Sequence, residues 1–340
     1  MSSSAFEIKV SIIIPVKRIS KYINESITHI FNLDYDHFEI LILPDNGDLS
    51  EIKFPPEKLN GKVKVIPTGS LGPAKKRDIG AKQAKGEILA FLDDDAYPRK
   101  DWLTSALRHF DNPEISAVGG PGVTPKEDSF WQRVSGAVYL SPLGGGNCDR
   151  YWPGNRCYFI DDWPSANLLV RKEDFGKAGG FNSQYWPGDD TKLCLDLIHK
   201  LNKKIIYDPN VFVWHHRRSG FFKHLKQVGR YGLHRGYFAK KYPESSFKIK
   251  YFIPSLFLLF LFFGLILYPH NFVLRSLFLI GLSIYGIGLI YSFVIILSRE
   301  RNILVSLLAL PYIFFTHLVY GFQFLRSFLF ARELKSKLRA

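Results

Sequence analysis

A run of five apolar residues that ends in three aspartates constrains the fold of this chain more than any other stretch. Residues 88–92 read Ile-Leu-Ala-Phe-Leu, and Asp93, Asp94 and Asp95 follow directly. An uninterrupted apolar run of this length is typical of a strand that is buried on both faces in an α/β protein. Such a strand delivers the residues after it to the rim of the sheet, where ligands bind. The stretch therefore predicts an α/β fold with acidic side chains at the sheet edge.

Three adjacent carboxylates repel one another, and their presence has two interpretations. A divalent cation would compensate the charge. Alternatively, Asp94 and Asp95 begin a turn ahead of a helix that starts near Asp101. The short motif alone does not decide between a cation site and a turn.

Strand-like and helix-like segments alternate along residues 1–214. We expect strands over residues 11–15, 39–43, 63–66, 87–92, 166–171, 205–207 and 211–214, a strand end at 118–122, and helices over 22–33, over 72–85 and from 189 onward. This alternation predicts crossover units and a Rossmann-like, mostly parallel sheet with helices on both faces. Residues 141–158 are rich in Gly, Pro, Asn and aromatic residues without periodicity, so we expect an ordered loop over the site.

Two further positions carry polar residues at expected ligand sites. Asp45 follows a strand, where its carboxylate can accept the imide hydrogen of a pyrimidine base, although a turn role in Asp-Asn-Gly explains it too. Lys75, Lys76 and Arg77 begin a helix, and their charges add to its positive end, which suits a diphosphate. A solvated basic face is the alternative.

Four segments, in order and spacing, resemble the nucleotide-binding half of family 2 glycosyltransferases of the GT-A fold, in particular membrane-anchored members that build exopolysaccharides or lipid-linked glycans. They are Ser11–Pro15, Asp45, Gly72–Gly80 and Ala84–Asp95. The resemblance implies that Asp93 and Asp95 hold Mn²⁺ or Mg²⁺ on the diphosphate of a nucleotide sugar, that Asp45 reads the base, and that Arg77 lies near the phosphates or the sugar. The other residues expected to contact the donor are Pro15, Val16, Lys17, Asp93 and Asp94.

A second acidic pair, Asp189 and Asp190, opens a helix with leucines at 193, 197 and 201 on one face. Helix capping explains one acid but does not require two. The family carries Glu-Asp at this place, and its second member is the catalytic base. The resemblance therefore implies that Asp190 is the base and that Asp189 supports it.

Residues beyond 185 supply further candidates. His215 can join the metal, and Arg217 and Arg218 can meet a diphosphate, although a basic cluster beside a membrane explains all three. Gln227–Tyr231 resembles the Gln-x-x-Arg-Trp signature of membrane-bound members, with Tyr in place of Trp. The residues expected to contact the acceptor or the diphosphate are Trp186, Arg217, Arg218, Gln227 and Arg230.

The net charge of +14 lies entirely in the C-terminal part of the chain. Residues 215–250 carry +9 and residues 251–340 carry +6, so residues 1–214 carry −1. A basic excess beside apolar segments predicts anionic lipid headgroups as the partner, and no zinc-finger spacing or arginine-rich arm indicates nucleic acid. The three cysteines predict a reducing compartment, and the N-terminal residues do not resemble a signal peptide.

The last third of the chain predicts a membrane anchor. Residues 252–268 and 277–298 contain no charge and are each near the length of a span. Residues 303–330 are interrupted by Pro311, His317, Gln323 and Arg326. Basic residues at 299 and 301 and in the tail all favour the cytoplasm, which predicts two spans plus a re-entrant or interfacial segment; three spans are the alternative.

These features predict a glycosyltransferase at the cytoplasmic membrane with four parts: a cytoplasmic GT-A catalytic domain over 1–214, a basic juxtamembrane segment over 215–250, transmembrane or interfacial helices over 251–330, and a basic tail over 331–340. The expected reaction is metal-dependent, inverting transfer from a UDP sugar to a lipid-linked or glycan acceptor. A processive polysaccharide synthase is one alternative, although it needs more spans for a channel. A nucleotide-sugar-binding scaffold without turnover is another.

Overall fold

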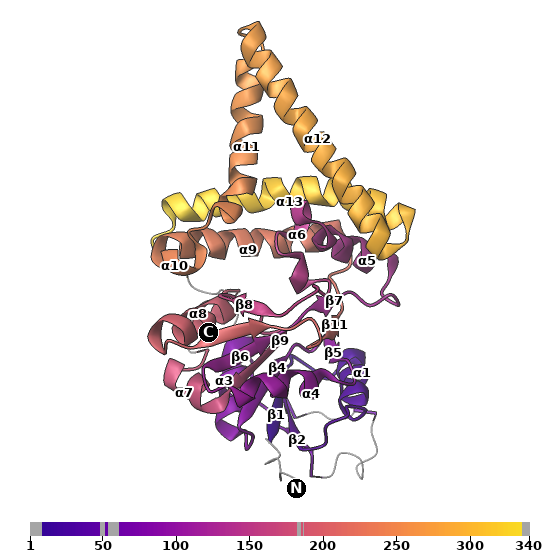
Figure 1. The fold of residues 1–340 in the computed structure, drawn as a ribbon, viewed down its shortest axis with the longest axis vertical. Helices are drawn as coiled ribbons and strands as arrows, with labels where there is room; N and C mark the ends of the chain where they lie inside the picture. Colours follow the sequence, from indigo (N-terminus) through magenta and orange to yellow (C-terminus); the bar gives the residue numbers. More distant parts are fainter. Residues whose placement is uncertain (1–8, 48–51, 54–60, 182–184, 186, 335–340) are drawn as a thin grey trace. The chain divides into compact units, whose positions relative to one another are not determined.

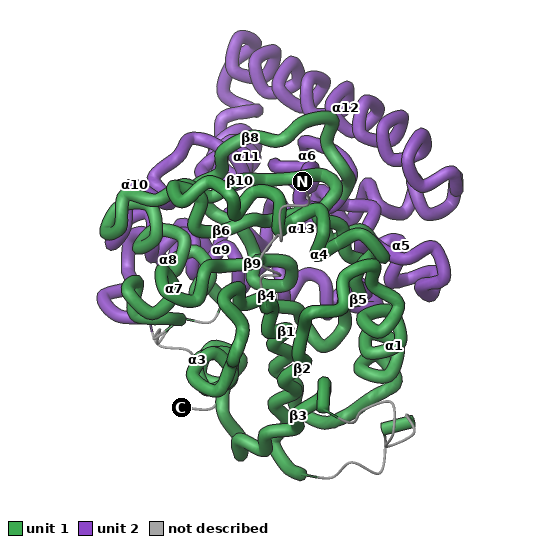
Figure 2. The backbone as a smooth tube through the Cα atoms, turned by 60° about the horizontal axis from the view of Figure 1, so that its bottom comes forward, with its two compact units in different colours: residues 1–123, 152–215, 335–340 green, residues 124–151, 216–334 purple. Residues whose placement is uncertain are grey.

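The computed structural model describes residues 9–47, 52–53, 61–181, 185 and 187–334. Within this part, the chain forms two compact units (Figure 2). The first unit contains residues up to 123 and residues 152–215, and the second contains residues 124–151 and 216–334. The boundaries at residues 214 and 250 that the sequence suggests for the functional parts stay a prediction.

The first unit is built on an eight-stranded sheet with the order β3-β2-β1-β4-β9-β6-β10-β8 (Figure 2). Its strands are β1 (Val10–Pro15), β2 (Phe38–Leu43), β3 (Val63–Val65), β4 (Ile88–Leu92), β6 (Ile115–Gly119), β8 (Tyr158–Ile160), β9 (Asn167–Arg171) and β10 (Lys204–Tyr207). Strands β1 to β4 pair in parallel, as do β6 and β10, whereas β9 runs antiparallel between β4 and β6. The predicted α/β class with a mostly parallel sheet is confirmed.

Helices cover both faces of this sheet because β1 is apolar on both sides. Ile12 and Ile14 pack into one core with the buried face of α1, and Ile13 packs into the other core. The helices and helical turns of this unit are α1 (Lys21–Ile30), α3 (Pro73–Gln83), α4 (Trp102–Leu107), η1 (Arg108–Asp111), α7 (Lys172–Ala178), α8 (Asp189–Leu195) and η4 (Asp196–Lys200). Pro73 stands in the first turn of α3, where its missing N–H costs nothing.

A small second sheet lies against the end of β4 and carries residues of the predicted site. It has the order β5-β11-β7, with β5 at Ala96–Pro98, β7 at Gly122–Val123 and β11 at Val213–His215. Strand β5 begins directly after Asp95, and its antiparallel register with β11 places His215 opposite Ala96. The rings of Tyr97 and Trp214 stack at 5.3 Å between centroids and support this pairing.

The second unit is helical. It contains α5 (Phe130–Ala137), η2 (Val138–Leu140), α6 (Pro142–Gly145), η3 (Cys148–Arg150), α9 (Phe221–Lys241), α10 (Pro243–Ser246), α11 (Ile249–Leu267), α12 (Phe272–Glu300) and α13 (Ile303–Phe330). The segment expected to be a loop over 141–158 thus includes two short helical turns, α6 and η3, and ends at the start of β8. Helices this short contain too few residues to show a helical period in the sequence.

Helices α9 and α13 run side by side in this unit (Figure 1), and three glycines of α9 permit the contact. A Cβ atom at Gly232 would lie 2.5 Å from the carbonyl oxygen of Tyr320, and one at Gly236 would lie 2.3 Å from that of Phe324. Helices α11, α12 and α13 are each long and apolar enough to cross a membrane, judged by length and composition. They fit the predicted membrane association.

Candidate active site

The three residues predicted to hold a cation come together where β4 ends. Ligand atoms of Asp93, Asp95 and His215 all lie within 4.8 Å of one another. The Nε2 atom of His215 is 3.0 Å from Oδ1 of Asp95, a contact set by the β5–β11 register. All three side chains are partly exposed. Two carboxylates and an imidazole with open positions can hold Mn²⁺, and also Mg²⁺, which prefers oxygen ligands.

A buried arginine joins this cluster to the second acidic pair. The guanidinium of Arg77 donates to Oδ1 of Asp93 at 2.5 Å and to Oδ2 of Asp189 at 3.3 Å. Its side chain is only 4% exposed, and it lies 5.4 Å from the ring centre of Phe181. Asp93 and Asp189 are 96 residues apart in the sequence. They lie at one site because the same guanidinium contacts both carboxylates. The position of Asp93 alone would not fix where Asp189 lies.

Burial, and to a smaller extent the charge of the neighbouring Asp190, raise the pKa of Asp189 to about 7 against the opposing effect of Arg77. A carboxyl group whose folded-state pKa exceeds its unfolded-state value of 3.8 binds more protons when folded. Its contribution to stability is therefore fully present below about pH 4 and is lost as the pH rises toward 7.

We expect Asp189→Asn to remove this pH dependence. In the presence of a chelator, the free energy of unfolding of the variant should rise relative to that of the unaltered protein as the pH increases from about 4 to about 7, at up to about 1.4 kcal/mol per pH unit. Thermal unfolding of both proteins at several pH values measures the difference. A constant difference across this range would show that Asp189 is ionised throughout.

Asp190 is held by backbone donors beside this group. The N–H of Thr191 donates to its Oδ1 at 2.8 Å, and the N–H of Ser165 donates to its Oδ2 at 3.4 Å. Thr191 in turn donates its hydroxyl to the buried Asp162 at 2.8 Å. These bonds fix the orientation of a half-buried carboxylate at the start of α8. The role of Asp162 was missed because no sequence pattern connects it to residue 191.

Asp45 is anchored by a buried lysine. The ammonium group of Lys76 donates to Oδ1 of Asp45 at 2.6 Å and to the carbonyl oxygens of Val16 and Leu43 at 2.6 and 3.1 Å. All three donors of a side chain that is 3% exposed are thus used. Pro15 and Val16 are buried at the end of β1, and Lys17 after them is exposed. Lys76 was predicted only as one of a basic cluster, whereas the structure makes it the residue that positions Asp45.

The remaining predicted residues do not belong to the described part of the first unit. Arg217, Arg218, Gln227 and Arg230 belong to the second unit, and Trp186 lies outside the described residues. The Nε–H of Arg217 donates to the hydroxyl of Thr124 at 3.1 Å, and its guanidinium lies 5.1 Å from the ring centre of Tyr151. Gln227 donates to the hydroxyl of Tyr231 at 2.9 Å, and Arg218 and Arg230 are exposed. Their roles at the acceptor or diphosphate stay predictions.

Family models match most of the chain. The model described as "Glycosyl transferase family 2" matches residues 11–164, and "Glycosyl transferase family group 2" matches residues 88–324, more than two thirds of the sequence. This chain is a family 2 glycosyltransferase. The prediction that it is an enzyme of the transferase class is therefore confirmed.

Curated relatives and a solved structure agree with this family. A dolichyl N-acetyl-α-D-glucosaminyl phosphate 3-β-D-2,3-diacetamido-2,3-dideoxy-β-D-glucuronosyltransferase from Methanococcus voltae is 25% identical, over 92% of this chain and 95% of the relative. A pre-mycofactocin glycosyltransferase from Mycobacterium tuberculosis is 28% identical over 52% of this chain and 37% of the relative. A mannosyltransferase from Pyrobaculum calidifontis, solved with GDP-Man and Mn²⁺, is 16% identical and has a TM-score of 0.56, covering 97% of this glycosyltransferase and 89% of that chain. This likeness confirms the GT-A fold.

Proposed function

We propose that this glycosyltransferase transfers a sugar, with inversion, from a UDP sugar to a lipid-linked glycan at the cytoplasmic face of a membrane. The observation that supports this most is the contact of Arg77 with both Asp93 and Asp189, because it brings the donor-side and base-side acids to one site. An in-line displacement needs these two groups on either side of one anomeric carbon.

The donor would lie along the carboxyl ends of β1, β2 and β4, where the GT-A fold places its ligand crevice. Asp45, fixed by Lys76, would accept the imide hydrogen of uracil. Asp93, Asp95 and His215 would hold the divalent cation. When bound, the cation neutralises charge on the departing diphosphate.

Asp190 would act as the general base. It takes the proton of the acceptor hydroxyl as that oxygen bonds to the anomeric carbon, while the bond from the same carbon to the diphosphate oxygen breaks. The hydrogen bonds from the backbone of Thr191 and Ser165 orient the carboxylate for this transfer. Asp189, neutral for part of the time near pH 7, would limit repulsion between the two acids and the diphosphate.

A lipid-linked acceptor is supported by two observations. The Methanococcus voltae relative, which matches 92% of this chain, is named as acting on a dolichyl-linked sugar phosphate. The second unit also exposes apolar side chains along α11 and α12, because few residues of either helix are buried. Anchoring the enzyme in the membrane that holds the acceptor raises the effective concentration of the acceptor.

Helix α13 would lie in the membrane interface rather than cross the bilayer. It packs along α9, and α9 exposes five cationic side chains: Lys223, Lys226, Arg230, Lys240 and Lys241. Each would cost about 2.5–3.5 kcal/mol at the bilayer centre, so α9 stays with the headgroups and keeps α13 beside it. Helices α11 and α12 are then the two spans.

This topology predicts that residue 340 and the catalytic unit lie on the same side of the membrane. In a bacterial host, green fluorescent protein fused after Ala340 should fluoresce, and alkaline phosphatase fused there should be inactive. Alkaline phosphatase inserted after His270, in the turn between α11 and α12, should be active and serves as the control. The opposite pattern at residue 340 would support three spans.

A donor panel tests the proposed reaction. Purified protein in detergent is incubated with UDP sugars and GDP-mannose, Mn²⁺ or Mg²⁺, and extracted polyprenyl-linked glycans, and nucleoside diphosphate release is recorded. We expect release only with UDP sugars, only with metal, and faster with acceptor lipid. Selective release from GDP-mannose would overturn the UDP assignment, and no release with any donor would favour the scaffold alternative.

A further inference from the structure

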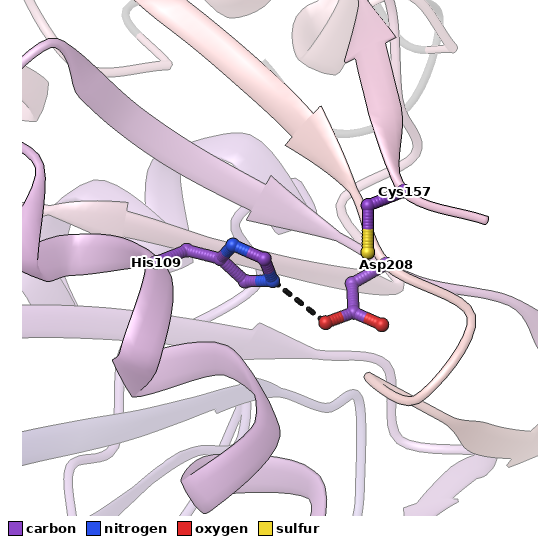
Figure 3. Close-up of side chains that lie close together, drawn as sticks. All are labelled: His109, Cys157 and Asp208. Carbon is purple, nitrogen blue, oxygen red and sulfur yellow. Dashed lines mark hydrogen bonds and ion pairs between the residues drawn. The ribbon is translucent and has the colours of Figure 1, made fainter.

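A second group of metal-binding side chains lies at the opposite end of the main sheet from β3. Ligand atoms of His109, Cys157 and Asp208 all lie within 4.8 Å of one another. The residues come from η1, from the segment before β8 and from the turn after β10 (Figure 3). They lie 48 and 51 residues apart in the sequence, so only the fold brings them together.

The group is separate from the active site. Strands β4, β6 and β10 run in the same direction, and β10 is three places from β4 in the sheet. At about 4.8 Å per strand, Asp208 lies roughly 14 Å from Asp93 along the sheet rim. The two clusters also differ in chemistry, because only the second includes a thiol.

Hydrogen bonds already hold the carboxylate of Asp208 in one position. Its side chain is 0% exposed, and its Oδ1 accepts the N–H of Asn210 at 2.8 Å. Its Oδ2 accepts from Arg108 and lies 2.6 Å from Nε2 of His109. Both carboxylate oxygens of Asp208 are therefore held by donors from two segments, η1 and the turn after β10. The guanidinium of Arg108 is the cationic partner of this buried carboxylate.

We propose that His109, Cys157 and Asp208 bind one Zn²⁺ ion that fixes the edge of the sheet. Nitrogen, sulfur and oxygen ligands in a tetrahedral zinc site lie about 3.4–3.6 Å from one another, so closing this group needs only small side-chain movements. Cys157 is exposed, and water can take the fourth position. On binding, the thiol loses its proton and the imidazole proton moves to Nδ1, so two ligand anions balance the ion.

The ion would add to the bonds that already join these three segments, which are those of Arg108 and His109 to Asp208 and the pairing of β8 with β10. It would join η1 and the start of the edge strand β8 to the turn that follows β10. That turn leads within seven residues to His215. A thiol and an imidazole favour zinc over Mn²⁺ and Mg²⁺, whereas Asp93, Asp95 and His215 suit Mn²⁺. The chain would thus bind two different cations at two sites.

Cobalt titration of the full-length protein tests the proposal. Protein purified in detergent, reduced with a phosphine and stripped with chelator, is titrated with Co²⁺ alone. We expect a thiolate-to-cobalt charge-transfer band that saturates at one equivalent and disappears when Zn²⁺ is added. The band should be lost in Cys157→Ser and weakened at least about tenfold in affinity in His109→Gln. Cys148→Ser and Asp95→Asn should retain it, because neither residue belongs to the group.

Thermal unfolding provides the second measurement. Zn²⁺ should raise the unfolding temperature of the unaltered protein and of Cys148→Ser more than that of Cys157→Ser, which keeps only the site at Asp93, Asp95 and His215. Because Cys157 is exposed, its replacement by serine should leave the fold intact, which circular dichroism checks. Absence of the thiolate band in the unaltered protein, its persistence in Cys157→Ser, or equal stabilisation of Cys157→Ser by Zn²⁺ would each overturn the proposal.

Discussion

Replacing Asp190 by asparagine should lower the rate of sugar transfer by about 10²–10⁴ while leaving the affinity for the UDP donor within about threefold. The amide keeps the size of the side chain but cannot accept the acceptor's proton. Turnover is measured by nucleoside diphosphate release, and donor affinity by calorimetry with Mn²⁺.

The matched control is Asp196→Asn. Asp196 lies six residues further along the same helical segment and pairs with Lys192 on its surface. This variant should keep full turnover. A turnover of Asp190→Asn within about tenfold of the unaltered enzyme would exclude Asp190 as the base. Loss of donor affinity in step with turnover would instead place the residue in the donor site.

Replacing Arg77 by methionine should destabilise the first unit by about 3–5 kcal/mol, because it leaves two carboxylates without their shared buried partner. For a domain of this size, that loss corresponds to a fall of about 6–20 °C in the unfolding temperature. The affinity for the nucleotide sugar should fall as well, because Asp93 loses the hydrogen bond from Arg77 that holds it. Thermal unfolding and donor titration measure the two effects.

The double variant Arg77→Met/Asp189→Asn should recover part of the lost stability, since a neutral amide needs no cationic partner. Lys75→Met serves as the control, because Lys75 is exposed on the same helix and its loss should change stability little. If Arg77→Met were as stable as Lys75→Met, the guanidinium would not be the link between the two acidic groups.

Much of the fold follows from local pattern. The continuous apolar run of β1 and the spacing of Ile23, Ile27 and Ile30 each predict one element, and each element forms nearly where expected. Helix α1 ends three residues before the predicted Leu33. The basic segment that contains α9 was predicted from its charge alone, although the spacing of Gly229, Gly232 and Gly236 indicated a close helix contact.

The site is harder to predict from the sequence than the fold, because its hydrogen bonds and ion pairs join residues that are far apart in the chain. The sequence predicts acids at Asp93 and Asp189, but the arginine that contacts both is 112 residues from the second. The ammonium of Lys76 is buried because of the way α3 packs on β1 and β2, which no basic cluster indicates. Long-range packing, rather than local propensity, decides which charges of such a cluster are solvated and which are structural.

Because β5 pairs with β11, the position of the cation ligand His215 depends on the number of residues in the turn before β11. Side chains alternate across a strand, so inserting a single residue into the turn at 209–212 would place Trp214 where His215 now lies and turn His215 away from Asp95. Such an insertion would leave all three side chains in the sequence and still remove one from the cation. In this family, relatives that differ in the length of this turn should therefore differ in their metal requirement, even where the ligand residues themselves are the same.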